Sequence, residues 1–259
     1  MTVNLHYQTY GQGNPVLILH GLFGSSRNWT VFARKLALHY QVLTVDLRNH
    51  GNSGHTATMS YREMAADIQQ FLQSRGYNQA SIIGHSMGGK VAMTFALTYP
   101  SMIDRLIVLD TAPVAYCNNR NNFHVLIDSL EALPLTELTG RKHADELLTS
   151  NIPDIQLRLY LLQNLVQDGA GHRWRINLSA LKQGLAELSH FPAFAATSMH
   201  TGASLFLGGS DSDHLQPRHH EAIFNYFREA QIEIIDEAGH WLHIDQPEAV
   251  LNRIVPFLR

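Results

Sequence analysis

The pentapeptide Gly84-His85-Ser86-Met87-Gly88 decides the fold of this 259-residue chain because of the segments on either side of it. Upstream, residues 80–83 form a short β-branched run that is typical of a buried strand. Downstream, residues 87–98 are expected to form a helix that ends at Tyr99-Pro100. A G-x-S-x-G sequence between a strand and a helix predicts a nucleophile elbow, a tight strained turn that exposes the serine hydroxyl. Glycines flank the serine because a side chain there would collide with the neighbouring strand or helix.

Two further segments favour a catalytic serine over a Gly/Ser-rich turn that only packs the helix against the sheet. A second apolar run, residues 16–19, leads into His20-Gly21-Leu22-Phe23-Gly24-Ser25. In serine hydrolases of this architecture, such a loop and the residue after the nucleophile supply the oxyanion-hole amides, so we assign those donors to Leu22 and Met87. Near the end of the chain, His240 follows another strand-like run, where a catalytic base is expected.

Apolar runs and amphipathic segments alternate along most of the chain, which predicts a mostly parallel sheet with helices on both faces. The expected strands are residues 3–10, 16–20, 41–46, 81–83, 105–110, 204–207 and 231–235. The expected helices are residues 29–38, 60–75, 87–98, 217–228 and 247 onward. Ligands bind such sheets at the carboxyl ends of the strands. Ser86, Asp110 and His240 each follow a strand end, so we expect them to meet there.

The alternation is interrupted between residues 111 and 202, where the sequence predicts a helical insertion. Its expected helices are residues 122–133, 138–149, 154–166 and 178–188. We therefore divide the chain into a core, residues 1–110 and 203–259, and a helical lid, residues 111–202. Acidic and basic side chains nearly balance in the lid, so it offers no obvious clamp for a polyanionic substrate.

Four motifs together resemble the α/β-hydrolases, and among them the YbfF-type bacterial esterases, which are relatives of a mitochondrial hydrolase. They are residues 20–25 (HGLFGS), 46–53 (DLRNHGNS), 84–90 (GHSMGGK) and 110–114 (DTAPV). The likeness covers nearly the whole chain and is closest over its first 115 residues. It implies a mostly parallel eight-stranded sheet with helices on both faces and a helical lid inserted after the sixth strand.

The expected chemistry needs a nucleophile, a base and an acid. Ser86 attacks an ester only if a base accepts its proton, and the imidazole of His240, with an ordinary pKa of about 6.5, suits that role. A carboxylate must hold the other ring nitrogen and stabilise the imidazolium. In many α/β-hydrolases it follows the seventh strand, where Asp211 and Asp213 stand, whereas in the YbfF-like group it follows the sixth, the place of Asp110. We favour Asp110 and keep Asp211, and after it Asp213, as alternatives.

Composition limits the partners of this protein. A net charge of −3 argues against nucleic acid or an anionic membrane as a main partner. No run of 18 apolar residues is present, and residues 1–10 do not resemble a signal peptide. The single cysteine, Cys117, excludes an internal disulfide and fits a reducing compartment. We expect a cytoplasmic monomer or small homo-oligomer whose partner is a small-molecule acyl ester or thioester.

Sixteen histidines raise the question of a metal site. The candidate groups are His219 with His220, His240 with His243, and His214 with Asp211 and Asp213. None follows an HExxH-type pattern, and no third ligand is evident for the His240 pair, so we expect neither a metal nor another cofactor. His85 and the segment Arg48-Asn49-His50 are expected to shape the loops, and Trp241 is expected to pack over the mouth of the site.

Three classes of function are consistent with these residues. The leading one is a carboxylic ester hydrolase that forms an acyl-enzyme on short to medium acyl esters, thioesters included. The second is a C–C bond hydrolase or lyase acting on an acidic metabolite, as in menaquinone-pathway relatives, which needs a basic pocket. The third is a binding protein without turnover, which the complete set of nucleophile, base and oxyanion loops argues against. The serine at position 86 disfavours haloalkane dehalogenase and epoxide hydrolase chemistry, which need an aspartate there.

Overall fold

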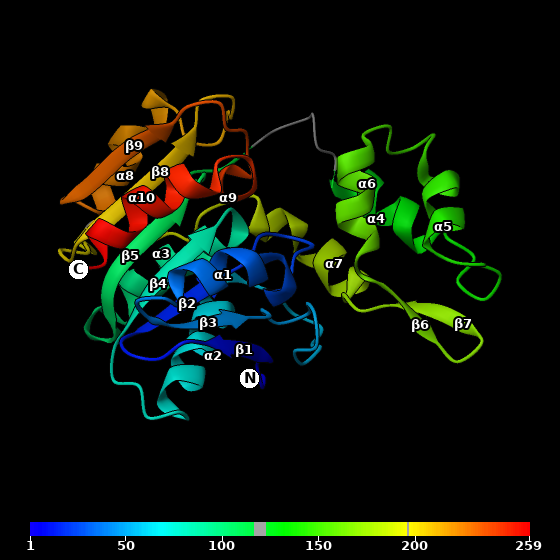
Figure 1. Cartoon of the computed structure of the whole chain (residues 1–259), viewed down its shortest axis with the longest axis horizontal. Coiled ribbons are helices and arrows are strands. Elements are labelled where there is room, and N and C mark those ends of the chain that lie inside the picture. Colours follow the sequence, from blue (N-terminus) through cyan, green and yellow to red (C-terminus); the bar gives the residue numbers. More distant parts are fainter. Residues whose placement is uncertain (117–122, 196) are drawn as a thin grey trace.

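The computed structural model describes residues 1–116, 123–195 and 197–259. Its centre is a seven-stranded sheet with the spatial order β1-β3-β2-β4-β5-β8-β9 (Figure 1). The strands are β1 (Tyr7–Tyr10), β2 (Pro15–Leu19), β3 (Gln41–Val45), β4 (Ala80–His85), β5 (Ile103–Leu109), β8 (Ser204–Gly209) and β9 (Ala230–Ile235). Strand β1 is antiparallel to β3, and the other neighbours in this sheet are parallel, so the mostly parallel sheet is confirmed.

Helices cover both faces of the sheet. One face carries α1 (Thr30–Leu36) and α10 (Pro247–Phe257), and the other carries α2 (Tyr61–Gln73), α3 (Met87–Thr98) and α8 (His220–Tyr226). A short helix, α9 (Leu242–Asp245), precedes α10, and 3₁₀ turns lie at Ser26–Trp29, Pro100–Met102 and Pro217–His219. Helix α2 begins after Ser60, whose hydroxyl accepts the Glu63 N–H at 3.2 Å.

Alternation along the central strands fills both faces of the core. In β2, Leu17 and Leu19 pack into the cluster under α2 and α3, whereas Val16 and Ile18 pack into the cluster under α1 and α10. All four side chains are at most 1% exposed. A strand buried on both faces reads as a continuous apolar run, which is why the sequence identifies it without a period-two pattern.

The expected count of eight strands is wrong, because the sheet has seven. The first expected strand, residues 3–10, contains β-structure only from Tyr7 to Tyr10. Two backbone N–H groups that precede β1 are hydrogen-bonded to side chains. The N–H of Val3 donates to Asp67 Oδ1 at 3.0 Å, and that of His6 donates to Ser53 Oγ at 2.8 Å. Those amides cannot also join a strand ladder. The insertion accordingly follows the fifth strand of the sheet in chain order, not the sixth.

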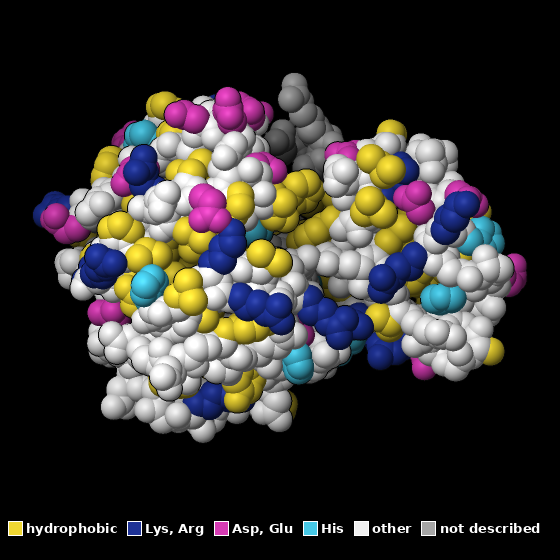
Figure 2. All heavy atoms as spheres, in the orientation of Figure 1, with side chains coloured by type: hydrophobic (Ala, Val, Ile, Leu, Met, Phe, Trp, Pro, Cys, Tyr) yellow, Lys and Arg dark blue, Asp and Glu magenta, His cyan; other side chains and the backbone are white. Residues whose placement is uncertain are grey.

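The chain between β5 and β8 forms helices α4 (Phe123–Glu131), α5 (Arg141–Leu148), α6 (Ile155–Leu162) and α7 (Leu178–Leu188). The expected helix 154–166 ends at Leu162 because a hairpin follows, β6 (Leu165–Asp168) and β7 (Gly171–Trp174). Its two-residue turn begins with Gly169 at φ +57°, and this turn glycine is a hairpin signal that lies just past the expected helix. Figure 2 shows hydrophobic side chains gathered along the hollow where this insertion meets the core.

Two expectations fall outside the described residues: the sole cysteine, Cys117, and the start of the first insertion helix at Asn122. Within the described ranges, no helix has both the length and the apolar character needed to cross a membrane.

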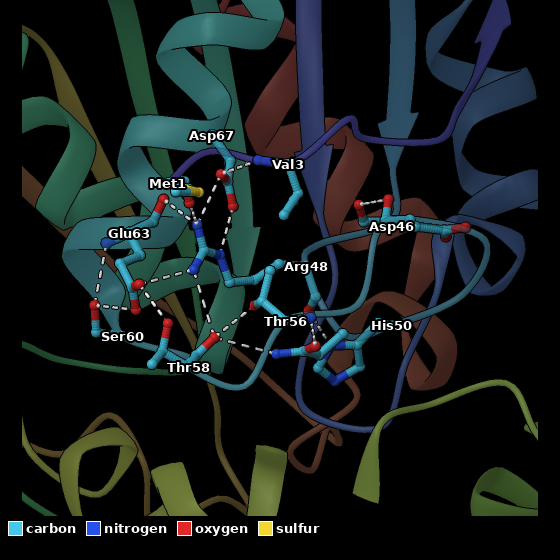
Figure 3. Close-up of polar contacts among 12 residues, drawn as sticks. Met1, Val3, Asp46, Arg48, His50, Thr56, Thr58, Ser60, Glu63 and Asp67 are labelled. Carbon is cyan, nitrogen blue, oxygen red and sulfur yellow. Dashed lines mark hydrogen bonds and ion pairs between the residues drawn. The ribbon is translucent and has the colours of Figure 1, made fainter. Parts of the chain in front are cut away.

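A buried ion pair holds the loop after β3 against α2 (Figure 3). The guanidinium of Arg48, which is 1% exposed, donates to both carboxylate oxygens of Asp67 at 2.6 and 2.9 Å. It also lies 3.0 Å from the Glu63 carboxylate and donates to the carbonyl of Met1 at 3.1 Å. Arg48 therefore fixes the shape of its loop, as expected from the sequence, and connects the N-terminus to α2.

Removing only one member of this pair should be strongly destabilising. Asp67→Ala leaves the Arg48 guanidinium buried without its main counter-ion, so we expect the free energy of unfolding to fall by about 3–5 kcal/mol in urea denaturation. The paired variant Arg48→Met/Asp67→Leu should lose much less. Glu248→Ala, which removes an exposed partner of Lys35, is the matched control and should cost under about 1 kcal/mol. An Asp67→Ala loss no larger than that of Glu248→Ala would contradict this account.

Candidate active site

Ser86 stands in the strained turn that its motif predicts. It caps α3 directly after β4 with φ 53° and ψ −117°, a conformation that non-glycine residues rarely adopt. The neighbouring backbone leaves no room for side chains beside it. A Cβ at Gly84 would lie 2.2 Å from the Gly88 carbonyl oxygen, and one at Gly88 would lie 2.3 Å from that of Leu19. Both glycines are therefore required for the helix to pack this closely against the sheet.

A short hydrogen bond joins Asp110 and His240. Asp110 follows β5, is fully buried, and accepts from Nδ1 of His240 at 2.7 Å. Its carboxylate also accepts from the Gly209 N–H at 3.2 Å and from the Ser212 hydroxyl. Three donors thus satisfy a charge that has no access to water. Because Nδ1 of His240 carries the donated proton, its Nε2 is left as the acceptor.

The other two carboxylates considered for this role point elsewhere. Asp211 and Asp213 are both exposed, and the Asp211 carboxylate accepts from its neighbour Ser210 at 3.0 Å. Their loop, which follows β8, instead reaches Asp110 through Gly209 and Ser212. The structure thus brings Asp110, rather than Asp211 or Asp213, to the ring of His240.

Three further imidazoles surround His240, and burial is the main reason that all of them have lowered pKa values. The ring of His214 stacks on that of His240 at 4.0 Å and 24°, and burial, with nearby His240, lowers its pKa to about 4. Burial, with His240 and His243 beside it, lowers the pKa of His85 well below its ordinary value, and Nε2 of His85 donates to the His240 carbonyl at 2.8 Å. His243 lies beneath them, stacked on Trp29 at 3.9 Å. These rings are neutral at neutral pH, so they add no charge that would oppose an imidazolium at His240.

Leu22 and Met87, the two expected oxyanion donors, lie close to Ser86. Leu22 lies in a turn closed by the Gly24 N–H donating to the Gly21 carbonyl at 3.0 Å, with Phe23 at φ 63°. Met87 is the first residue of α3, where an N–H has no carbonyl partner within the helix. Both residues line a cavity together with Ser86. The assignment of their amides as oxyanion donors stays a prediction.

Ser86 opens onto two adjoining cavities. The first has about 550 Å³ of space and is lined by Ser86, Met87, Lys90, Tyr116 and Leu185, among others. The second has about 880 Å³, and its lining includes Ser86, His85, His240, Trp241 and Tyr160. Trp241 packs against Tyr160 of α6 with ring centroids 5.4 Å apart, so it lies beside the site as expected.

The insertion is hydrogen-bonded directly to the loop that carries the oxyanion donor. The Tyr160 hydroxyl donates to the Leu22 carbonyl at 3.0 Å, and Asn164 Nδ2 donates to the Phe23 carbonyl at 2.7 Å. A third link joins the N–H of Asn177, at the start of α7, to the Asn49 carbonyl at 2.9 Å. Asn49 thus shapes the contact between core and insertion.

One group of possible metal ligands is present within the described ranges. Single ligand atoms of Asp110, His214 and His240 lie within 4.8 Å of one another. Nδ1 of His240 is already hydrogen-bonded to Asp110, so a metal here would have to displace that proton. The expected pairing of His240 with His243 does not form a ligand set, because His243 is stacked on Trp29.

Sequence reasoning missed three side chains at the site: His214, Ser212 and Lys90. His214 was considered only as a metal ligand, yet it stacks on the base. Strand order could have identified both His214 and Ser212. Because β8 pairs with β5, the loop after β8 must lie beside Asp110. Lys90 lies on α3, outside the insertion to which the charge-balance argument applies.

Comparisons with known proteins identify the family of this chain. Residues 14–247 match the family model described as alpha/beta hydrolase fold. The chain is 38% identical over 249 residues to sn-1-specific diacylglycerol lipase ABHD11 of Mus musculus, covering 94% of this chain and 80% of the mouse protein. It is 30% identical over 261 residues to Esterase YbfF of Escherichia coli K12, covering 100% and 99%. A solved structure titled "Marine microorganism esterase" superposes with a TM-score of 0.95 at 34% identity, covering 99% and 100%. The resemblance inferred from the four motifs is confirmed.

The buried histidines should make the fold sensitive to acid. Burial, with nearby His240, lowers the pKa of His243 from 6.5 to about 3, so its stabilising contribution is complete above pH 6.5 and is lost as the pH falls. Between about pH 7.5 and pH 5 this ring alone should cost about 2 kcal/mol of unfolding free energy. His243→Phe keeps a ring against Trp29 but removes the titration.

Between about pH 7.5 and pH 5, the unfolding free energy of His243→Phe should therefore fall by about 2 kcal/mol less than that of the wild type. Urea denaturation at both pH values measures this difference. The control is His39→Gln at an exposed position, which should leave the pH dependence unchanged. Identical pH dependence in His243→Phe and the wild type would refute the assignment.

Proposed function

The chain belongs to the alpha/beta hydrolase fold family and is an esterase or lipase of that family, and from this premise we propose that it hydrolyses short to medium acyl esters through an acyl-enzyme on Ser86. Ser86 is the nucleophile, His240 the base and Asp110 the acid. The observation that carries the proposal is the 2.7 Å hydrogen bond between Asp110 and His240, whose ring shares a cavity with the strained Ser86.

In the proposed reaction, Nε2 of His240 accepts the Ser86 proton as the hydroxyl oxygen attacks the ester carbonyl. Asp110, with two other donors fixing its carboxylate, stabilises the imidazolium that forms. The amides of Leu22 and Met87 donate to the tetrahedral oxyanion, and each such donor typically lowers the barrier by about 3–4 kcal/mol. His240 then gives its proton to the leaving alcohol. Water, activated by the same ring, attacks the acyl-enzyme and releases the acid.

The two cavities suggest which part of the substrate lies where. The leaving alcohol must receive its proton from His240, and His240 lines the larger cavity. The acyl group then occupies the smaller cavity beside Met87 and Lys90, which His240 does not line. We refer to these below as the alcohol cavity and the acyl cavity. The size of the acyl cavity supports acyl groups of short to medium length, and a thioester would fit the same arrangement.

We further propose that the insertion, residues 111–202, acts as a lid over these cavities. Support comes from Tyr160 and Asn164, whose side chains bond to the carbonyls of Leu22 and Phe23 in the oxyanion loop. A lid tied to that loop both covers the ester and helps hold an amide donor in position. The ester lipids implied by the name of the mouse relative are one possible substrate type for such a site.

The second class of function, a C–C bond hydrolase or lyase, has one observation in its favour. Its acidic substrate needs a basic group near the serine, and Lys90 lies in the acyl cavity. An ester with an acidic acyl group would use the same lysine, so the ester hydrolase remains the better-supported proposal.

Substitution of each proposed triad member should separate this mechanism from its alternatives. We expect Ser86→Ala to abolish hydrolysis of p-nitrophenyl acetate, butyrate and octanoate, and Asp110→Asn to lower kcat by about 10³- to 10⁴-fold because the His240 ring loses its partner. Asp211→Asn is the matched control and should change kcat less than about twofold, since that carboxylate is exposed.

A fluorophosphonate should label the wild type but not Ser86→Ala. A binding protein without a reactive serine would not be labelled in either form. The mechanism fails if no acyl length gives serine-dependent turnover, or if Asp211→Asn lowers kcat as much as Asp110→Asn.

A further inference from the structure

Lys90 is a buried cation one helical turn from the nucleophile. Its N–H donates to the Ser86 carbonyl at 3.1 Å, so the two residues share one side of α3. The residue is 3% exposed, and its side chain lines the acyl cavity together with Ser86 and Tyr116. The lysine thus faces the space that the proposed mechanism gives to the acyl group.

The ammonium group of Lys90 has no carboxylate partner in the described part of the chain. Nζ contacts the carbonyls of Ser189 and His190 at 3.4 and 3.2 Å and lies over the rings of Tyr116 and Tyr61 at 4.8 and 5.7 Å. The undescribed residues, 117–122 and 196, contain neither Asp nor Glu. Burial alone lowers the pKa of Lys90 from 10.5 to about 7. A buried ammonium in this state is stabilised by any anion that enters the cavity.

The rest of the acyl cavity does not explain a buried lysine. Its lining includes Leu22, Met87, Phe123, Leu185 and Leu188, which suit an apolar chain. A purely apolar acyl group would leave the Lys90 ammonium buried without an anionic partner, with only the carbonyls of Ser189 and His190 and the two tyrosine rings around it. A site built around a buried polar group discriminates strongly against a ligand that lacks the matching group.

We propose that Lys90 binds a carboxylate at the far end of the acyl group, so that the preferred substrates are monoesters or thioesters of short dicarboxylic acids. This inference rests on the proposed function, which assigns the acyl group to the cavity that Lys90 lines. On a regular helix the Cα atoms of Ser86 and Lys90 are about 6 Å apart along the axis, and the lysine stem extends the reach. Glutarate and adipate span such a distance from ester carbonyl to carboxylate.

Matched pairs of esters test the proposal kinetically. Monomethyl glutarate and methyl valerate have acyl chains of equal length and differ in the terminal carboxylate. We expect the ratio of their kcat/KM values to fall by about 10- to 100-fold in Lys90→Met, because an ionic hydrogen bond is lost. Lys142→Met, at a lysine whose side chain is 93% exposed, is the control and should leave the ratio and both rates unchanged. An unchanged ratio in a folded Lys90→Met protein overturns the proposal.

A binding measurement separates this inference from the proposed function. Titration calorimetry of glutarate against Ser86→Ala should give an affinity about tenfold or more above that of Ser86→Ala/Lys90→Met, with methyl valerate, which has no carboxylate, showing no such difference. If no ester is hydrolysed but glutarate binds in this Lys90-dependent way, the carboxylate site stands and the esterase mechanism fails. If esters are hydrolysed but glutarate binds both proteins equally, the mechanism stands and Lys90 only ties α3 to the end of α7.

The wild type supplies a test that does not depend on the folding of a variant. The ratio of kcat/KM for monomethyl glutarate to that for methyl valerate should fall by about tenfold between about pH 6 and pH 8.5, as Lys90 loses its proton. Any pH effect on the chemical step that the two esters share cancels in the ratio. Of the groups facing Lys90, burial holds the pKa of His214 at about 4, raises that of Tyr116 to about 12 and raises that of Tyr61 further, so none titrates in this interval. A ratio that stays constant with pH contradicts the proposal.

Discussion

The close approach of α3 to the sheet is the constraint on which the rest of the site depends. Gly84 and Gly88 have no room for a Cβ, and that crowding holds Ser86 at a positive φ between strand and helix. One backbone conformation thereby sets three things: where the hydroxyl points, where the first free amide of the helix lies, and which residue follows one turn later on the same side. The strain at Ser86 persists because packing on both sides allows no alternative.

The polar part of the site comes from the ends of neighbouring parallel strands. Asp110 follows β5, Ser212 and His214 follow β8, and His240 follows β9, so strand order alone brings them together. Asp110 is fully buried, and three donors satisfy its carboxylate. Around His240, burial keeps the neighbouring imidazoles neutral. The ring of His240 is thus the one that lies against the Asp110 carboxylate.

Several features of the fold and the site could be predicted because they depend on local signals. The elbow follows from G-x-S-x-G between an apolar run and a helix, and the central strands follow from runs buried on both faces. Other features could not be predicted because they depend on which distant groups meet. Residues 3–6 have the composition of a strand, but Asp67 and Ser53 accept the N–H groups of Val3 and His6, so β1 begins only at Tyr7. In the insertion, the expected helix 154–166 ends at Leu162 because the strand β6 pairs with β7 further along the chain.

The sequence by itself determined the family, the mostly parallel sheet, and Ser86, His240 and the oxyanion loop as candidates, because each is carried by a short motif or a periodic run. Only the tertiary structure decided which carboxylate reaches His240, since Asp110 and Asp211 both follow strand ends and a linear sequence does not give the direction of a side chain. It also placed His214 on the base and left Lys90 buried without a carboxylate partner in the described chain. Burial and pairing arise from contacts between segments 100 to 130 residues apart, and no local signal encodes them.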